Sequence, residues 1–294
     1  MNAIRALMFP SLVLVLCIPA IADTGFLDRS VMLQGKTYAY QVYVPANYSA
    51  NRSWPVIVYL HGNEHQGEDG MRQTNAALAD EIRERRASFP ALVIFPQAQT
   101  DMWWHSPAMQ EMVLAELDRT LAEFHGDAGR VYLTGFSMGG TGAYRLAYHN
   151  NKRFAALVVV AGRVEPGSNY TAERAEIDRK ANAFVVAPDP FAALAASLKG
   201  LPVWIFHGAA DERVAVEQSR RLVAALKNQN ANVKYTEYPG VKHVGSAIKA
   251  YSDEDMIEWL FQQRQPKAPL GSRAPLSPLF CCGYPPADRR VRVE

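Results

Sequence analysis

Short, almost continuous apolar runs recur along the chain, and longer segments with helical spacing separate them. The runs stand at residues 55–62, 91–97, 130–137, 154–162 and 201–208, and residues 232–240 form a last strand pattern. Runs that are apolar on both faces are typical of parallel strands buried between two layers of helices. Before them, residues 30–45 alternate around a Gly-Lys turn and predict a hairpin.

The segments between the runs have amphipathic helical periodicity. Residues 106–126 place apolar side chains on one face and end at Gly126, and residues 215–229 and 256–261 show the same pattern. Strands that alternate with helices predict an α/β fold with a mostly parallel sheet of about eight strands, flanked by helices. Functional side chains are then expected beyond the carboxyl ends of the strands.

Composition agrees with one large domain. The chain has 294 residues, is 49% hydrophobic and carries a net charge of +2, which does not favour a nucleic-acid partner. We expect one domain over residues 23–263. The longest stretch between strands, residues 162–200, has a polar first half and a helix-like second half, and predicts a small cap over the site.

The two ends differ from the body. Residues 1–22 carry Arg5, an apolar run from Leu7 to Ile18 and an Ala-Ile-Ala cleavage pattern, which together predict a signal peptide and a secreted or periplasmic protein. The run is short for a membrane anchor, and no stable membrane association is expected. Residues 264–294 are basic and proline-rich and predict a disordered tail. The oligomeric state is left open.

A nucleophile motif stands in the middle of the chain. Gly135-Phe136-Ser137-Met138-Gly139 fits G-x-S-x-G, and it follows a predicted strand and precedes a predicted helix. That is the context of a nucleophile elbow, in which side chains at the two glycine positions would collide with neighbouring backbone. Ser137 is therefore the predicted nucleophile.

A serine nucleophile needs a base and an acid that orients the base, and in this architecture the order is Ser, Asp or Glu, then His. After Ser137 come His149 on the following helix, His207 at a strand end and His243 in a loop after the last strand. The order favours His243 as the base.

The candidate acid is Asp211, which comes just past the strand at residues 201–208. Glu212 beside it and Asp189 in the predicted cap are the alternatives. No metal and no organic cofactor are expected.

The stretch His61-Gly62-Asn63-Glu64-His65 has two interpretations. It fits the zinc pattern H-x-x-E-H, but that pattern requires a helix, which Gly62 and Asn63 would break directly after a strand. A third ligand at a suitable spacing is also lacking. We therefore interpret the stretch as an oxyanion loop in which the N–H of Asn63 or Glu64, with that of Met138, faces the developing oxyanion.

The segments VYLHG, GFSMGGTGAY, PVWIFHGAADERV and GVKHVGS resemble those of secreted α/β-hydrolase esterases, such as phospholipase/carboxylesterases, feruloyl esterases and polyhydroxybutyrate depolymerases. The resemblance covers residues 31–263. It implies an α/β-hydrolase fold with a catalytic triad of Ser137, Asp211 and His243. It also implies that Asn63 and Met138 are the oxyanion donors. Glu64 stands where relatives often have glycine, which adds a negative charge near the acyl pocket.

Substrate contacts are predicted at Glu64 and at Trp103 and Trp104, which follow the strand at residues 91–97. A tryptophan there could stack on an aromatic acyl group, an alcohol or a sugar, or pack under the cap. The sequence predicts a serine esterase for a small or aromatic ester of feruloyl or acetyl type, either a small molecule or linked to a polymer. A serine peptidase, a polyester depolymerase and a non-catalytic ligand-binding relative are the alternatives.

Overall fold

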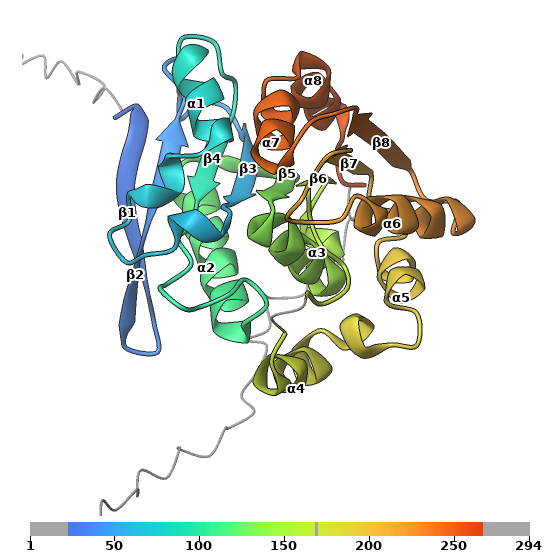
Figure 1. Ribbon diagram of the computed structural model, residues 1–294. Helices are drawn as coiled ribbons and strands as arrows, with labels where there is room; N and C mark the ends of the chain where they lie inside the picture. Colours follow the sequence, from blue (N-terminus) through green and yellow to red (C-terminus); the bar gives the residue numbers. More distant parts are fainter. Residues whose placement is uncertain (1–22, 168–169, 267–294) are drawn as a thin grey trace, which may run out of the picture.

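The computed structural model describes residues 23–167 and 170–266, and the predictions for residues 1–22 and 267–294 lie outside the described part (Figure 1). Eight strands form one sheet in the order β1-β2-β4-β3-β5-β6-β7-β8. They are β1 (Gly25–Leu33), β2 (Lys36–Val44), β3 (Trp54–Leu60), β4 (Leu92–Phe95), β5 (Gly126–Phe136), β6 (Ala156–Val160), β7 (Val203–Gly208) and β8 (Val233–Tyr238). Strand β2 is antiparallel to both β1 and β4, and all other neighbours are parallel. The predicted α/β-hydrolase sheet is confirmed.

Helices cover both faces of this sheet (Figure 1). One layer is α1 (Ala77–Glu84), α7 (His243–Tyr251) and α8 (Glu254–Gln262), and the other is α2 (Pro107–Glu123), α3 (Met138–Asn150), α5 (Pro190–Ser197) and α6 (Glu217–Asn228). Every residue of β3, β4, β6 and β7 is buried, because both faces of these strands meet a helical layer. Within the described ranges, no helix is both long and apolar enough to cross a membrane.

The segment predicted as a cap is helical in both halves. Its first helix, α4 (Ala172–Ala181), is capped by Thr171 and packs mainly on the 3₁₀ turn that follows it. Its second helix, α5, is capped by Asp189 and packs against α3 and α6 as part of the helical layer. Only the part before and within α4 lies at the candidate site described below.

One smaller prediction needs correction, and one helix was missed. Helix α2 ends at Glu123, and Gly126 begins β5 instead of ending the helix, because the reversal takes place at His125, whose φ is 49°. Helix α1 was not predicted. Beyond α8, the backbone N–H of Gln265 donates to the carbonyl of Gly129 at 2.9 Å.

Candidate active site

Ser137 occupies the sharp turn between β5 and α3. Its φ is +57° and its ψ is −116°, a conformation that a residue with a side chain adopts only when its surroundings impose it. Its backbone N–H donates to the carbonyl of Val160 on the neighbouring strand at 2.9 Å. The turn therefore presents the serine hydroxyl beyond the carboxyl end of the sheet.

The two glycines of the turn have no room for a side chain. A Cβ at Gly135 would lie 2.3 Å from the carbonyl oxygen of Gly139, and a Cβ at Gly139 would lie 1.8 Å from that of Leu60. The backbones of the turn and of β3 thus approach as closely as the G-x-S-x-G motif predicts.

His243 is brought to the serine by the last part of the chain. Its Nε2 lies 2.8 Å from Oγ of Ser137, and its ring packs against Phe136 with centroids 4.8 Å apart. The prediction of a loop position was wrong: His243 is the first residue of α7, with Lys242 as the N-cap. The helix fixes the backbone that carries the imidazole, which is buried.

Asp211 completes a chain of three groups. Its Oδ2 lies 2.6 Å from Nδ1 of His243, and its Oδ1 accepts the backbone N–H groups of Arg213 and Val214, both at 2.9 Å. Burial raises the pKa of Asp211, but these bonds and one from His207 outweigh it and hold the pKa well below its usual value. The carboxyl group is therefore a carboxylate near neutral pH.

The alternative acids lie elsewhere. Glu212 is exposed and pairs with Lys242 at 3.4 Å, and Asp189 accepts the first N–H groups of α5. The structure thus places His243 within hydrogen-bond reach of both Ser137 and Asp211 and leaves both rivals outside.

His207 is a contact that the sequence analysis missed. Its Nε2 lies 3.2 Å from Oδ2 of Asp211 and 3.0 Å from the carbonyl of Val214, and its Nδ1 lies 2.7 Å from Oγ of Ser219. Because a carbonyl only accepts, Nε2 carries the proton and donates, while Nδ1 accepts from the serine. A buried histidine at the end of β7, four residues before the acid, was the available signal.

His61 is buried below the loop that follows β3. Its Nε2 lies 3.0 Å from the backbone N–H of Ala98, which must be the donor, so Nδ1 carries the proton and donates to the carbonyl of Gly62 at 2.6 Å. Burial lowers the pKa of His61 to about 3. Asn63–His65 form a 3₁₀ turn, not the α-helix that H-x-x-E-H requires, and both nitrogens of His61 serve to hold the loop.

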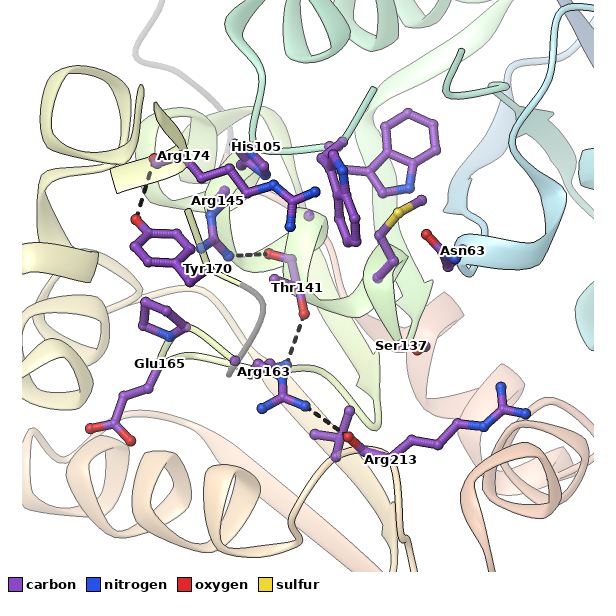
Figure 2. A pocket seen from close by; sticks show the side chains of 17 residues that line it. Asn63, His105, Ser137, Thr141, Arg145, Arg163, Glu165, Tyr170, Arg174 and Arg213 are labelled. Atoms are coloured by element: carbon purple, nitrogen blue, oxygen red, sulfur yellow. Dashed lines mark hydrogen bonds between the residues drawn. The ribbon is translucent and has the colours of Figure 1, made fainter. Parts of the chain in front are cut away.

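The residues predicted to donate to the oxyanion lie at the pocket of the serine. Asn63 and Met138 line the pocket next to Ser137, whereas Glu64 does not (Figure 2). Glu64 is exposed and pairs with Arg213 at 2.8 Å, which links this loop to the loop of Asp211.

The pocket beside Ser137 has a volume of about 200 Å³. The two predicted tryptophans differ in it. Trp104 is only 1% exposed, and its indole N–H donates to the carbonyl of His61 at 3.0 Å, so it packs under the site. Trp103 is half-buried in the wall, and the guanidinium of Arg174 lies 4.1 Å from its ring centre.

Several polar residues of the wall were not predicted. Segments far apart in the sequence contribute them, and they are His105, Thr141, Arg145, Arg163, Glu165, Tyr170, Arg174 and Arg213. Isolated basic residues on separate helices and loops carry no periodic or motif signal, so only the folded chain brings them together.

Comparisons with known proteins agree with this architecture. The family described as "Putative esterase" matches residues 30–262. The crystal structure of a thermostable esterase is 27% identical, with a TM-score of 0.64 over 81% of this chain and 63% of the esterase chain. An S-formylglutathione hydrolase from Agrobacterium tumefaciens is 20% identical, with a TM-score of 0.63 over 84% of this chain and 98% of the hydrolase.

One curated protein extends far beyond this chain. The "Uncharacterized secreted protein" of Arthroderma benhamiae is 26% identical over 235 residues, which are 74% of this chain and 24% of that protein. This chain therefore spans about a quarter of the length of the curated relative it matches.

Proposed function

Because the chain belongs to this esterase family, we propose that it is a serine carboxylic-ester hydrolase with Ser137 as nucleophile, His243 as base and Asp211 as the orienting acid. The observation that carries the proposal is the hydrogen-bonded series from Ser137 Oγ to His243 Nε2, at 2.8 Å, and from His243 Nδ1 to Asp211 Oδ2, at 2.6 Å.

In the first half of the reaction, Ser137 Oγ attacks the ester carbonyl while its proton passes to Nε2 of His243. Asp211 accepts a hydrogen bond from Nδ1–H of His243 and stabilises the positive charge of the imidazolium. The tetrahedral intermediate collapses when Nε2 returns the proton to the departing alcohol. In the second half, His243 takes a proton from water as the water oxygen attacks the acyl group. The second intermediate then collapses, the acyl–Oγ bond breaks, Nε2 returns the proton to Ser137 Oγ, and the acid is released.

The negative oxygen of each intermediate is held by backbone N–H groups. Met138 supplies one from the first turn of α3, where the helix dipole also favours negative charge. Asn63 supplies the other N–H group. Its position in the pocket lining, which Glu64 does not share, supports Asn63 as this donor. Each such donor contributes about 3 kcal/mol to stabilising the transition state.

The pocket suits a short acyl or single-ring ester. Its volume of about 200 Å³ is small, and Trp103 offers a flat wall for an aromatic group. Feruloyl and acetyl esters are therefore the substrates to test, with a peptide p-nitroanilide as the comparison for peptidase activity. We place the enzyme outside the cytoplasm, an assignment that rests on the predicted signal peptide.

The decisive experiment compares the wild type with Ser137→Ala on p-nitrophenyl acetate and with a fluorophosphonate probe. The wild type should hydrolyse the ester and be labelled, and the variant should lose about 10⁴-fold or more of kcat and all labelling. Circular dichroism serves as the folding control. A folded Ser137→Ala protein with wild-type turnover contradicts the proposal, and so does a wild type that is neither labelled nor active.

A further inference from the structure

The pocket beside Ser137 has a strongly positive lining. Four arginines border it, and Glu165 is the only acidic residue among the lining side chains of the described chain (Figure 2). The arginines are Arg145, Arg163, Arg174 and Arg213. A small pocket lined in this way favours a ligand group of negative charge.

Two of the arginines already have carboxylate partners. Arg145 forms a buried, two-point ion pair with Asp178 at 3.1 and 3.2 Å. Arg213 pairs with Glu64 at 2.8 Å on the exposed rim. Glu165, in turn, is held by Arg221 from outside the lining at 2.7 Å. These ion pairs offset the charges of Arg145, Arg213 and Glu165.

Arg163 differs from Arg145 and Arg213 in the groups that it contacts. Its backbone N–H donates to Oγ1 of Thr141 at 2.9 Å, which fixes the start of its segment against α3. Its guanidinium donates to the carbonyl of Arg213 at 2.7 Å, and no carboxylate of the described residues forms an ion pair with it. A guanidinium has five N–H donors in a planar fork that matches a carboxylate, so most of its donors are available to a ligand.

Arg174 lies in the wall at a second side of the pocket. Its guanidinium lies over the ring of Trp103 at 4.1 Å from the centroid, which keeps its charge at the wall. Burial lowers the pKa of the neighbouring His105 to about 4, and Arg145 and Arg174 contribute to that shift. His105 is therefore neutral near pH 7. Figure 2 shows Arg163 and Arg174 on either side of Thr141, with Ser137 across the pocket.

We propose that this enzyme acts preferentially on esters that carry a carboxylate, and that Arg163 is the residue that selects them. The carboxylate would be bound by the guanidinium fork while the ester carbonyl lies at Ser137, with any flat part of the molecule against Trp103. This inference rests on the proposed function, because it concerns the substrate of the same site.

The test compares esters that differ only in a carboxylate or its uncharged amide. On the acyl side, the pair is mono-4-nitrophenyl glutarate and 4-nitrophenyl 4-carbamoylbutanoate. On the alcohol side, the pair is 3-(acetoxymethyl)benzoate and 3-(acetoxymethyl)benzamide. The readout is the ratio of kcat/KM for the charged ester to that for the neutral one. Both members of a pair are measured on one protein sample, so the amount of folded enzyme cancels.

The wild type should prefer the charged ester of at least one pair by about tenfold or more, and the favoured pair identifies the side of the ester that reaches Arg163. Arg163→Met should bring this ratio close to one, and Arg163→Lys, which keeps the charge without the fork, should retain part of it. Arg86→Met removes an exposed arginine that is not in the lining, and it should leave the ratio at the wild-type value.

Two failures can be told apart. If the wild type hydrolyses neither member of either pair, the proposed esterase function fails together with the inference. If it hydrolyses the neutral esters as well as the charged ones, or if Arg163→Met keeps the full preference, the esterase function stands and selection by Arg163 is refuted.

Discussion

Nε2 of His207 lies 3.2 Å from Oδ2 of Asp211, the same oxygen that lies 2.6 Å from Nδ1 of His243. One carboxylate oxygen therefore lies close to the ring nitrogens of two imidazoles that belong to different elements, β7 and α7. Since Oδ1 is already held by two backbone N–H groups, the carboxylate is fixed at both oxygens. His207 thus acts through Asp211 as a positioning residue, without touching the serine.

Replacing His207 by Phe should keep the ring volume and remove the Nε2–H donor. We expect kcat/KM for p-nitrophenyl acetate to fall about tenfold. His207 helps to depress the pKa of Asp211, so in the variant this pKa rises towards its usual value. The carboxylate is then lost at a higher pH, so the loss of kcat/KM that follows from protonation of Asp211 should begin at a higher pH.

His207→Gln keeps a side-chain N–H and should lie closer to the wild type in both measurements. His149→Phe is the matched control, because His149 lies on the outer part of α3 against the carbonyl of Ala181. Wild-type pH profiles for both His207 variants would show that this histidine serves packing alone.

The buried pair of Arg145 and Asp178 joins the pocket wall to α4. Asp178 also accepts from the hydroxyl of Tyr170 at 2.7 Å and the amide of Asn182 at 2.9 Å. Asp178→Asn leaves the guanidinium of Arg145 buried without a counter-charge, which should lower the free energy of unfolding by about 3 kcal/mol. Asp118→Asn, in the more exposed pair with Arg153, should change it by only about 0.5 kcal/mol. Equal losses in urea unfolding would contradict this difference.

Much of the fold could be predicted because the central strands are buried on both faces and are therefore apolar throughout. The positions of Ser137, Asp211 and His243 followed from strand ends and chain order. Helix α4 escaped prediction because Asp178 is its only buried residue, so it has no apolar stripe.

The arginines of the pocket show a second limit of prediction from the sequence. Arg145 lies on α3, Arg163 and Arg174 lie on either side of residues 168–169, and Arg213 follows the acid. Their convergence depends on how the loops pack, and neither period nor spacing encodes it. Trp103 and Trp104 are neighbours in sequence and both line the pocket, yet only the fold shows that Trp104 is almost fully buried there while Trp103 is half-buried.

The close approach of Gly139 to the backbone of β3 can be tested by adding one methyl group at Gly139. A Cβ at Gly139 would lie 1.8 Å from the carbonyl oxygen of Leu60, a backbone atom that cannot rotate away. Gly139→Ala should therefore lower the unfolding free energy by about 3 kcal/mol and remove esterase activity. Gly62→Ala meets Phe136 at 3.4 Å, an ordinary contact, and its melting temperature should stay near that of the wild type. A Gly139→Ala enzyme as stable and active as the wild type contradicts the elbow geometry.

The buried carboxyl group of Glu116 on α2 should make the stability of the protein depend on pH. It is fully buried, and neither of its carboxyl oxygens has a hydrogen-bond partner among the described residues. Burial raises the pKa of Glu116 well above its usual value, so the folded protein holds a proton there that the unfolded chain releases. The proton held by Glu116 therefore stabilises the folded state. This stabilisation is complete below the pKa that Glu116 has in the unfolded chain, and it is lost as the pH rises through its pKa in the folded protein.

Glu116→Gln removes the ionisation and nearly keeps the shape. We expect the unfolding free energy of the wild type to decrease between about pH 5 and about pH 8, and that of the variant to decrease less, because only the wild type must keep a carboxyl protonated. Urea unfolding at the two pH values measures both slopes. Glu111→Gln, an exposed change on the same helix, should keep the wild-type slope. If the slopes of wild type and Glu116→Gln are equal, the carboxyl group of Glu116 does not hold its proton in the folded protein.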